Sequence, residues 1–382
     1  MSELYHEKRF SWEGFAERLD EKFRLGYTTD MHDDSKAQTI TTIAQLEKHL
    51  QLTDEERAFG NLQGVLPLAI PSYFLSLIDK DDPHDPLRIQ VVPTIHEGEH
   101  LEEENIDPLA EVDHSVTARL IHRYPSRVAF LVTDICAMYC RHCFRRRFTG
   151  TFQGPATRAE IEEAASYLAK HREVKEILLT GGDMMTLSDG KIEELITIFR
   201  EARQDLVIRL CTRMPAAYPA RITRELVAII KGFNTAPFYL MTQFNHPREL
   251  TEEAVAAVGM FVDAGIPAMN QSVLLKGVND SADTLEELCN KLIFSRIKPY
   301  YLFQGDLVEG TSHFRVPLKR GLALEKELRR RLSGLAMPLY AVDLPQGGGK
   351  VPLTEGYLQE SRGCAVWNFT TVEGKKRSYP KE

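Results

Sequence analysis

Long apolar runs are missing from this sequence. Nowhere in the 382 residues do about 18 apolar residues follow one another, which is the length that a membrane-spanning helix needs. The charged N-terminus MSELYHEKRFSWEGF also lacks the apolar core of a signal peptide. We therefore expect a cytoplasmic protein that does not contact the membrane.

Excess positive charge and abundant cysteine are also absent. Lysine and arginine number 47 against 55 acidic residues, and the resulting net charge of −8 argues against general nucleic-acid binding. Six cysteines in a chain of this length do not make a disulfide framework. In a reducing compartment, cysteines that lie close together in the sequence indicate metal binding or catalysis.

From about residue 128, apolar runs alternate with amphipathic stretches. The runs predict buried strands at 128–134, 176–183, 206–212, 237–244, 267–275 and 297–304. Helical spacing predicts helices at 158–171, 191–203, 222–233, 251–265, 283–296 and 319–332. This order is typical of an α/β fold with a parallel sheet and right-handed crossovers. Six units are too few to close an eight-fold barrel, so we expect a partial (β/α)6 barrel with its chemistry at the carboxyl ends of the strands.

The ends of the chain follow other patterns. Residues 1–115 contain helix-like and acidic stretches and the turn-rich segment DKDDPHDP, and we expect a mainly helical N-terminal region there. The barrel core is expected at 116–316. Residues 317–382 are expected to form a C-terminal α+β extension.

Three cysteines form a cluster directly after the first predicted strand. Cys136, Cys140 and Cys143 have the spacing C-x3-C-x2-C, and no fourth cysteine completes the set. Three thiolates can hold one face of an iron–sulfur cluster and leave one iron free for another ligand. The alternative is a zinc knuckle with His142 or a remote residue as its fourth ligand. Because His142 is adjacent to Cys143, and neighbouring residues rarely bind one ion together, we favour the cluster.

The cysteine segment CAMYCRHCFRRRF resembles the lysine 2,3-aminomutase family of the radical S-adenosylmethionine (SAM) superfamily. Other segments resemble the family in the same order, namely SYFLSLIDKDDPHDPLR, HRYPSR, LLTGGD, FNHP, NQSVLLKGVND, DLVEGTSHFR and DLPQGGGK. The resemblance implies an isomerase with a partial barrel of the radical SAM type. It also implies a [4Fe-4S] cluster, SAM, pyridoxal 5′-phosphate (PLP) and an electron donor such as flavodoxin or ferredoxin.

The resemblance assigns residues to each cofactor. The cluster would be held by Cys136, Cys140 and Cys143. The residues at or near SAM would be His142, Gly181, Gly182, Asp183, Arg213 and Gln271. PLP would bind covalently to Lys350, with its phosphate held by Arg123, Tyr124 and Arg127. Lys350 follows a glycine run, but Val351 comes next where a nucleotide-binding phosphate loop requires serine or threonine.

The resemblance also implies an amino-acid substrate. Arg145 matches the carboxylate-binding arginine, and Asp306 and Asp343 match the pair that binds the distal ammonium of lysine. Relatives that act on glutamate lack this pair, so we expect conversion of L-lysine to β-lysine. Alternatives are another cationic substrate such as arginine, or a β-lysine-forming enzyme that serves elongation factor modification. From a different class, a non-catalytic iron–sulfur or zinc protein is the further alternative.

Two departures from the family concern a zinc site shared between subunits. Ser281 stands where long family members have a cysteine, and no cysteine follows Cys364. We therefore expect no zinc, although a homodimer remains possible. Two further departures, Phe144 in place of threonine and Phe303 in place of tyrosine, bear on the shape of the pocket.

Overall fold

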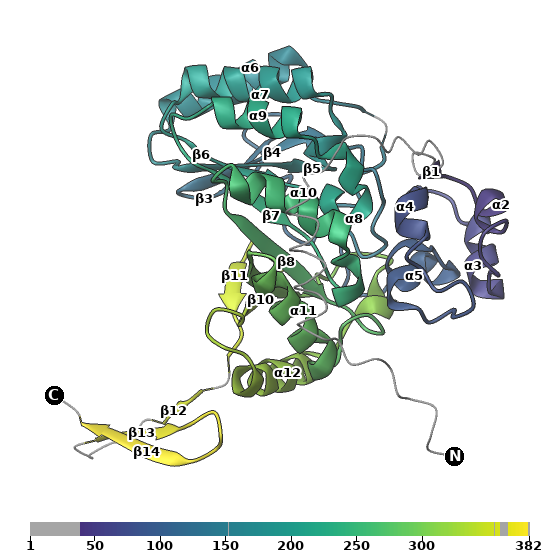
Figure 1. Ribbon diagram of the computed structural model, residues 1–382, viewed down its shortest axis with the longest axis vertical. Helices are drawn as coiled ribbons and strands as arrows, with labels where there is room; N and C mark the ends of the chain where they lie inside the picture. The colour runs from purple at the N-terminus through teal and green to yellow at the C-terminus, as the bar shows by residue number, and fades with distance from the viewer. Residues whose placement is uncertain (1–38, 152, 355, 360–365, 381–382) are drawn as a thin grey trace.

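A computed structural model describes residues 39–151, 153–354, 356–359 and 366–380. Within these residues, nine strands form one large sheet, drawn in the centre of Figure 1. Across the sheet the strands are ordered β11 (Gly349–Pro352), β10 (Leu339–Leu344), β9 (Ile297–Gln304), β8 (Ala268–Leu274), β7 (Phe238–Thr242), β6 (Val207–Cys211), β5 (Glu176–Gly181), β4 (Arg127–Thr133) and β3 (Leu120–Tyr124).

The parallel core of this sheet runs from β4 to β10, and the edge strands β3 and β11 are antiparallel to their neighbours. The six predicted strands are confirmed as β4 to β9. The sheet contains one more parallel strand than we expected, because β10 pairs with β9 after the crossover helix α12. The boundaries at 115 and 316 remain predictions, and the sheet continues past the second of them.

The six predicted helices are confirmed and cover one face of the sheet (Figure 1). They are α6 (Arg158–Lys170), α7 (Asp189–Ala202), α9 (Arg224–Gly232), α10 (Glu252–Asp263), α11 (Ala282–Phe294) and α12 (Leu318–Arg331). Five begin after a serine or threonine whose side chain accepts a backbone N–H of the first turn. Ser281 caps α11 in this way.

Side chains alternate along the strands between a buried core on one face of the sheet and a cavity on the other. In β5, Ile177 and Leu179 are fully buried in the core, whereas Leu178 and Thr180 line a cavity. Because successive side chains of a strand point to opposite faces, the helices cover one face of the sheet and the cavity lies on the other. The core beneath the helices includes an edge-to-face pair, Phe130 and Phe199, with ring centroids 5.3 Å apart.

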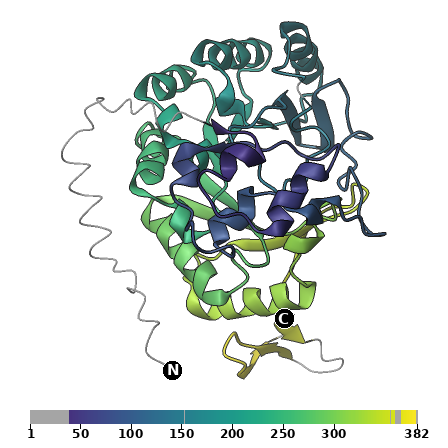
Figure 2. The same ribbon diagram turned by 90° about the vertical axis from the view of Figure 1, so that its right-hand side faces the viewer.

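The described part of the N-terminal region lies beside the cysteine loop (Figure 2). Its short elements are β1 (Thr39–Ile40), α2 (Ile43–Leu46), α3 (Asp54–Ala58), η2 (Phe59–Asn61), β2 (Ile70–Pro71), α4 (Ser72–Leu75), α5 (Pro86–Val91) and η3 (Ile95–Gly98). Two backbone hydrogen bonds join this region to the loop, from Tyr139 N to Ala69 O and from Arg141 N to Gln90 O. The region therefore supports the loop from outside the barrel.

Short elements complete the chain. The loops that follow the strands contain η4 (Met184–Thr186), α8 (Met214–Ala217), η5 (Pro219–Arg221), η6 (Pro247–Glu249) and η7 (Ser312–Phe314). Near the C-terminus, a separate antiparallel sheet, at the bottom of Figure 1, contains β12 (Leu358–Gln359), β13 (Val366–Thr370) and β14 (Lys376–Pro380). Cys364 lies outside the described residues. No helix in the described ranges has the length and apolar character needed to cross a bilayer.

Candidate active site

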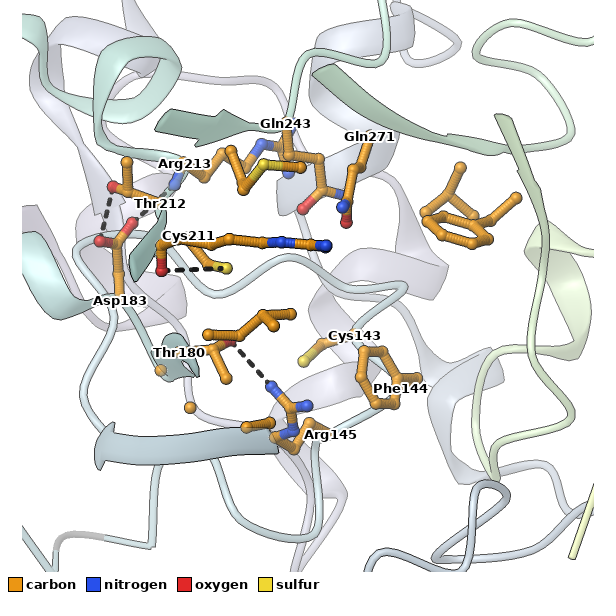
Figure 3. A pocket seen from close by; sticks show the side chains of 18 of the residues that line it. Cys143, Phe144, Arg145, Thr180, Asp183, Cys211, Thr212, Arg213, Gln243 and Gln271 are labelled. Atoms are coloured by element: carbon orange, nitrogen blue, oxygen red, sulfur yellow. Dashed lines mark hydrogen bonds between the residues drawn. The ribbon is translucent and has the colours of Figure 1, made fainter. Parts of the chain in front are cut away.

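A cavity of about 380 Å³ lies on the face of the sheet opposite the crossover helices. Figure 3 shows part of its lining. Every site residue predicted from the sequence lines this one cavity: Arg123, Tyr124, Arg127, Cys136, Cys140, His142, Cys143, Arg145, Gly181, Gly182, Asp183, Arg213, Gln271, Asp306, Asp343 and Lys350. The fold therefore brings together residues that are more than two hundred positions apart in the sequence.

The cysteine loop begins where β4 ends, and the buried Asp134 folds it back. The Asp134 carboxylate accepts hydrogen bonds from Gln153 N at 3.0 Å, Gly154 N at 2.8 Å and the Thr151 hydroxyl at 3.0 Å. The three cysteines are free thiols that line the cavity. Burial raises the pKa of Cys136 and of Cys143, and the neighbouring sulfur atoms raise it further. The donor set of three cysteine sulfurs facing one cavity fits an iron–sulfur cluster, which thiolates bind.

His142 contacts two amide side chains that follow β7. Its Nε2 lies 3.2 Å from Gln243 Nε2 and 3.3 Å from Asn245 Nδ2, so it accepts hydrogen bonds from the two amides. Burial holds the pKa of His142 well below its usual value, and the ring is therefore neutral. The described residues contain no group of three or more His, Cys, Asp or Glu side chains arranged to hold a single metal ion.

Two glycines at the end of β5, Gly181 within the strand and Gly182 directly after it, let the cysteine loop pack against the strand. A Cβ at Gly182 would lie 2.3 Å from the backbone oxygen of Ile135, and a Cβ at Gly181 would lie 2.6 Å from that of Thr133. Gly181 also has φ +115°, which side chains rarely adopt. The glycines therefore fix the loop close to the strand end.

Asp183 ties β5 to β6. Its Oδ1 accepts from the Thr212 hydroxyl at 2.6 Å and from Met185 N at 2.9 Å, and its Oδ2 accepts from Arg213 N at 2.7 Å (Figure 3). Both carboxylate oxygens are thus committed within the protein. This arrangement holds the residues that follow β6 in place.

Arg213 connects the cysteine loop to residues that the sequence did not single out. Its guanidinium donates to Cys140 Sγ at 2.8 Å, to Gln90 Oε1 at 2.6 Å and to Glu249 Oε2 at 2.9 Å. Its Nε is buried and has no partner among the described residues. Gln90 belongs to α5 and Glu249 to η6, so three distant segments fix one guanidinium.

A second group of charges surrounds Lys350. The antiparallel register of β10 and β11 places Asp343 directly opposite Lys350, and Lys350 Nζ lies 2.5 Å from Asp343 Oδ2. Arg123 Nη2 donates to Asp343 Oδ1 at 2.8 Å and to the Tyr124 hydroxyl at 2.6 Å. The Arg127 guanidinium stacks 3.8 Å from the centre of the Tyr124 ring and makes no hydrogen bond to another described residue.

Asp306 completes this charged end of the cavity. Burial, together with repulsion from the Asp343 carboxylate, raises the pKa of Asp306 to about 7. No described residue donates a hydrogen bond to it. A carboxylate in this state gains from a cation that enters the cavity.

Arg145 follows the cysteines in the same loop and is held by Glu111, another residue that sequence reasoning missed. Arg145 Nη2 donates to Glu111 Oε1 at 2.7 Å, and Nε donates to Oε2 at 3.0 Å. Arg145 Nη1 donates to the Thr180 hydroxyl at 3.1 Å (Figure 3). The Phe144 ring centroid is 4.7 Å from Arg145 Cζ, so Phe144 packs beside the guanidinium.

Comparison with known proteins identifies the family. Residues 130–289 match the model of the radical SAM superfamily. The chain is 43% identical over 320 residues to L-lysine 2,3-aminomutase of Clostridium subterminale, covering 84% of this chain and 76% of the relative. It is 42% identical over 360 residues to L-lysine 2,3-aminomutase of Acetoanaerobium sticklandii, covering 93% of this chain and 86% of that relative.

Two further matches extend this comparison. Glutamate 2,3-aminomutase of Clostridioides difficile is 39% identical over 337 residues, covering 88% of this chain and 79% of the relative. A crystal structure of a radical SAM methyltransferase from Sphaerobacter thermophilus matches with a TM-score of 0.45 and 18% identity, over 58% of this chain and 68% of that one. With identities near 40% over most of its length, the chain belongs to the lysine 2,3-aminomutase family: it is a radical SAM aminomutase, an isomerase whose cofactors are a [4Fe-4S] cluster and SAM.

Proposed function

We propose that this enzyme moves the amino group of L-lysine from C2 to C3, forms β-lysine, and uses PLP together with the cluster and SAM. The observation that carries the proposal is the charge distribution of the cavity. Two carboxylates, Asp306 and Asp343, lie at the end that holds Lys350, and a guanidinium, Arg145, lies beside the cysteine loop. Lysine presents complementary groups: a carboxylate at one end and an ammonium at the other.

The residues present fit the iron–sulfur cluster and SAM. Cys136, Cys140 and Cys143 would hold three irons and leave the fourth to the amino and carboxylate groups of SAM. Arg213 donates to one of these sulfur atoms and carries a free buried Nε–H. We propose that this guanidinium stabilises the anionic cluster and directs its remaining donor toward the SAM carboxylate.

The residues around Lys350 fit PLP. The Lys350 amine lies within the cavity, 4.1 Å from the centre of the Phe303 ring, which can pack against a planar cofactor. The free Arg127 guanidinium, with Arg123 and the Tyr124 hydroxyl, supplies donors for a phosphate. When bound, the cluster and SAM supply a carbon radical that removes a substrate hydrogen, and PLP carries the nitrogen that migrates.

The acidic pair becomes available when Lys350 and Arg123 bind the cofactor. In this structure both cations pair with Asp343. Once they contact PLP instead, Asp343 keeps only the Tyr124 hydroxyl at 3.5 Å among its hydrogen-bond partners in the described residues, and Asp306 has none there. Two carboxylates at one end of a cavity offset much of the cost of burying one ammonium. A glutamate side chain would place a third negative charge there, so the pair favours a cationic substrate.

An anaerobic assay with a panel of amino acids tests the proposal. The reconstituted enzyme is incubated separately with lysine, arginine, glutamate and alanine, and kcat/KM is compared. We expect lysine to be preferred. Arginine as the best substrate would keep the acidic pair as the side-chain site and change only the substrate, whereas preference for glutamate or alanine would refute the assignment of the pair.

We also propose that an electron donor such as flavodoxin or ferredoxin reduces the cluster, and that the protein contains no zinc. Ser281 supports the absence of zinc, since its hydroxyl caps α11 and supplies no thiolate. Metal analysis of the purified protein tests this directly, and one zinc ion per chain would contradict it.

A further inference from the structure

Arg145 is held from several sides by protein groups. Glu111 binds it through two hydrogen bonds of 2.7 and 3.0 Å, and the Thr180 hydroxyl accepts a third at 3.1 Å. The Phe144 ring packs against the guanidinium. Both charged side chains are nearly buried, with 10% of Arg145 and 8% of Glu111 exposed. A guanidinium bound in this way has one orientation.

Two N–H groups of the Arg145 guanidinium have no hydrogen-bond partner among the described residues. A guanidinium has five N–H groups in a planar fork. Nε–H and one N–H of Nη2 are directed at Glu111, and one N–H of Nη1 is directed at Thr180. One N–H on each terminal nitrogen therefore remains uncommitted to any described residue. Two donors on adjacent nitrogens match the two oxygens of a carboxylate.

Glu111 reaches Arg145 from outside the barrel. It belongs to the segment 105–116, which passes over the cavity between distant parts of the sheet. Asn105 N donates to Leu307 O, and the Pro108 carbonyl accepts from Gln346 N in the β10–β11 turn. At the opposite edge of the sheet, His122 N in β3 donates to His114 O of the same segment. The segment is thus fixed at both edges of the sheet, on either side of Glu111.

We propose that Glu111 is a positioning residue for substrate recognition: it holds the Arg145 guanidinium so that its two remaining donors face the substrate carboxylate. The inference rests on the proposed function, in which Arg145 binds that carboxylate. Glu111 touches no substrate atom. Its own negative charge would repel the incoming carboxylate, so the orientation of Arg145 has to outweigh this repulsion for Glu111 to be useful.

Asp107 provides a matched control for charge. Its Oδ1 lies 3.1 Å from Arg147 Nε, and Arg147 also lies 3.3 Å from Glu111. Asp107→Asn therefore removes one negative charge from the same cluster at a residue that bonds neither Glu111 nor Arg145. Asp107 Oδ2 also accepts from Val112 N at 2.9 Å, and the amide oxygen of asparagine can accept this bond. If Glu111→Gln raises KM for lysine and Asp107→Asn does not, the rise comes from the lost orientation of the Arg145 guanidinium and not from the lost negative charge.

The test compares steady-state kinetics of the reconstituted variants. We expect Glu111→Gln to raise KM for lysine on the order of 10- to 100-fold, as for the loss of charged hydrogen bonds, with kcat little changed. Inhibition by 1,5-diaminopentane, which has both amines of lysine and no carboxylate, should be unaffected. Iron and PLP contents should match those of wild type, and Asp107→Asn should keep the wild-type KM.

The outcomes separate this inference from the proposed function. If Arg145→Lys leaves KM for lysine unchanged, Arg145 is not the carboxylate site and the proposed function fails at that residue. If Arg145→Lys raises KM and Glu111→Gln does not, only the inference is overturned. The inference is also overturned if Glu111→Gln weakens the binding of lysine and of 1,5-diaminopentane equally. It is overturned as well if Glu111→Gln and Asp107→Asn raise KM for lysine equally.

A second variant covers the case in which Glu111→Gln does not fold. Thr180→Val keeps the shape of the side chain and removes one acceptor of Arg145. We expect a several-fold rise in KM for lysine, as for the loss of one hydrogen bond, and unchanged inhibition by 1,5-diaminopentane. An unchanged KM in that variant would overturn the inference.

Discussion

Asp306→Asn probes the substrate end of the cavity. The substitution keeps the shape of the side chain and removes one of two carboxylates that would face the lysine ammonium. Truncating one partner of a buried charge pair costs about 2–5 kcal/mol. That range corresponds to a loss in kcat/KM for lysine of roughly 30-fold to several thousand-fold. Iron, SAM and PLP binding should be retained, because Asp306 makes no hydrogen bond to the described residues that would hold them.

The pH dependence of the same residue sharpens this prediction. Burial and the neighbouring Asp343 raise the pKa of Asp306 from 3.8 to about 7 in the free enzyme. Only the ionised carboxylate attracts the ammonium, so kcat/KM should rise about tenfold per pH unit below 7 and level off above it. In Asp306→Asn this rise should disappear. A wild-type profile that is flat between pH 5 and 8, or an unchanged rise in the variant, would refute the reasoning.

As the pH rises toward 7, the free energy of unfolding should fall, whereas kcat/KM for lysine should rise. A carboxyl whose pKa is raised on folding binds more protons in the folded than in the unfolded chain between pH 3.8 and about 7. The free energy of unfolding therefore falls as pH rises through this window, and the penalty is fully present above it. Asp306→Asn removes the penalty, so at pH 8 the substrate-free variant should melt at a higher temperature than wild type. Thermal unfolding of the two proteins at pH 5 and pH 8 checks this, and a lower melting temperature of the variant at pH 8 would count against it.

Three further substitutions test the cofactor sites. Lys350→Ala should lose the visible absorbance of lysine-bound PLP while keeping the iron–sulfur spectrum; an unchanged PLP band would place the cofactor on another lysine. Cys140→Ala should lose the bound cluster in iron and sulfide analysis, whereas Cys211→Ala, in the same cavity, should keep it; iron loss in both would refute the three-cysteine assignment. Gly182→Ala should destabilise the protein by about 1–3 kcal/mol through overpacking against the loop. In denaturant unfolding Gly190→Ala, with open space around it, should show no such loss, and equal stabilities of the two variants would contradict the packing argument.

The sequence predicts the barrel well because its signals are local. Five of the six crossover helices begin after a capping serine or threonine, and the first buried strand contains a continuous apolar run, VAFLV at 128–132. The strand β10 was missed as a member of the sheet, because only its middle residues are buried and its neighbour β9 lies more than thirty residues earlier. Local pattern does not show such a pairing.

The cofactor residues were found through motifs, and their supports were not. Gln90, Glu111 and Glu249 each bind an arginine of the site across 34 to 123 residues of sequence. A single glutamate or glutamine in a loop or short helix looks like a surface residue until the fold supplies its partner. The role of Gly182 was also incompletely predicted, because the close approach of Ile135 O depends on how the loop returns to the strand.

The central claim is that this enzyme moves the amino group of lysine from C2 to C3. Lysine labelled with ¹⁵N at the α-amino group is incubated anaerobically with the reconstituted enzyme, SAM, PLP and a reductant, and the product is followed by NMR. The account predicts β-lysine with ¹⁵N attached to C3. Recovery of unchanged lysine by an enzyme that converts glutamate under the same conditions would contradict it.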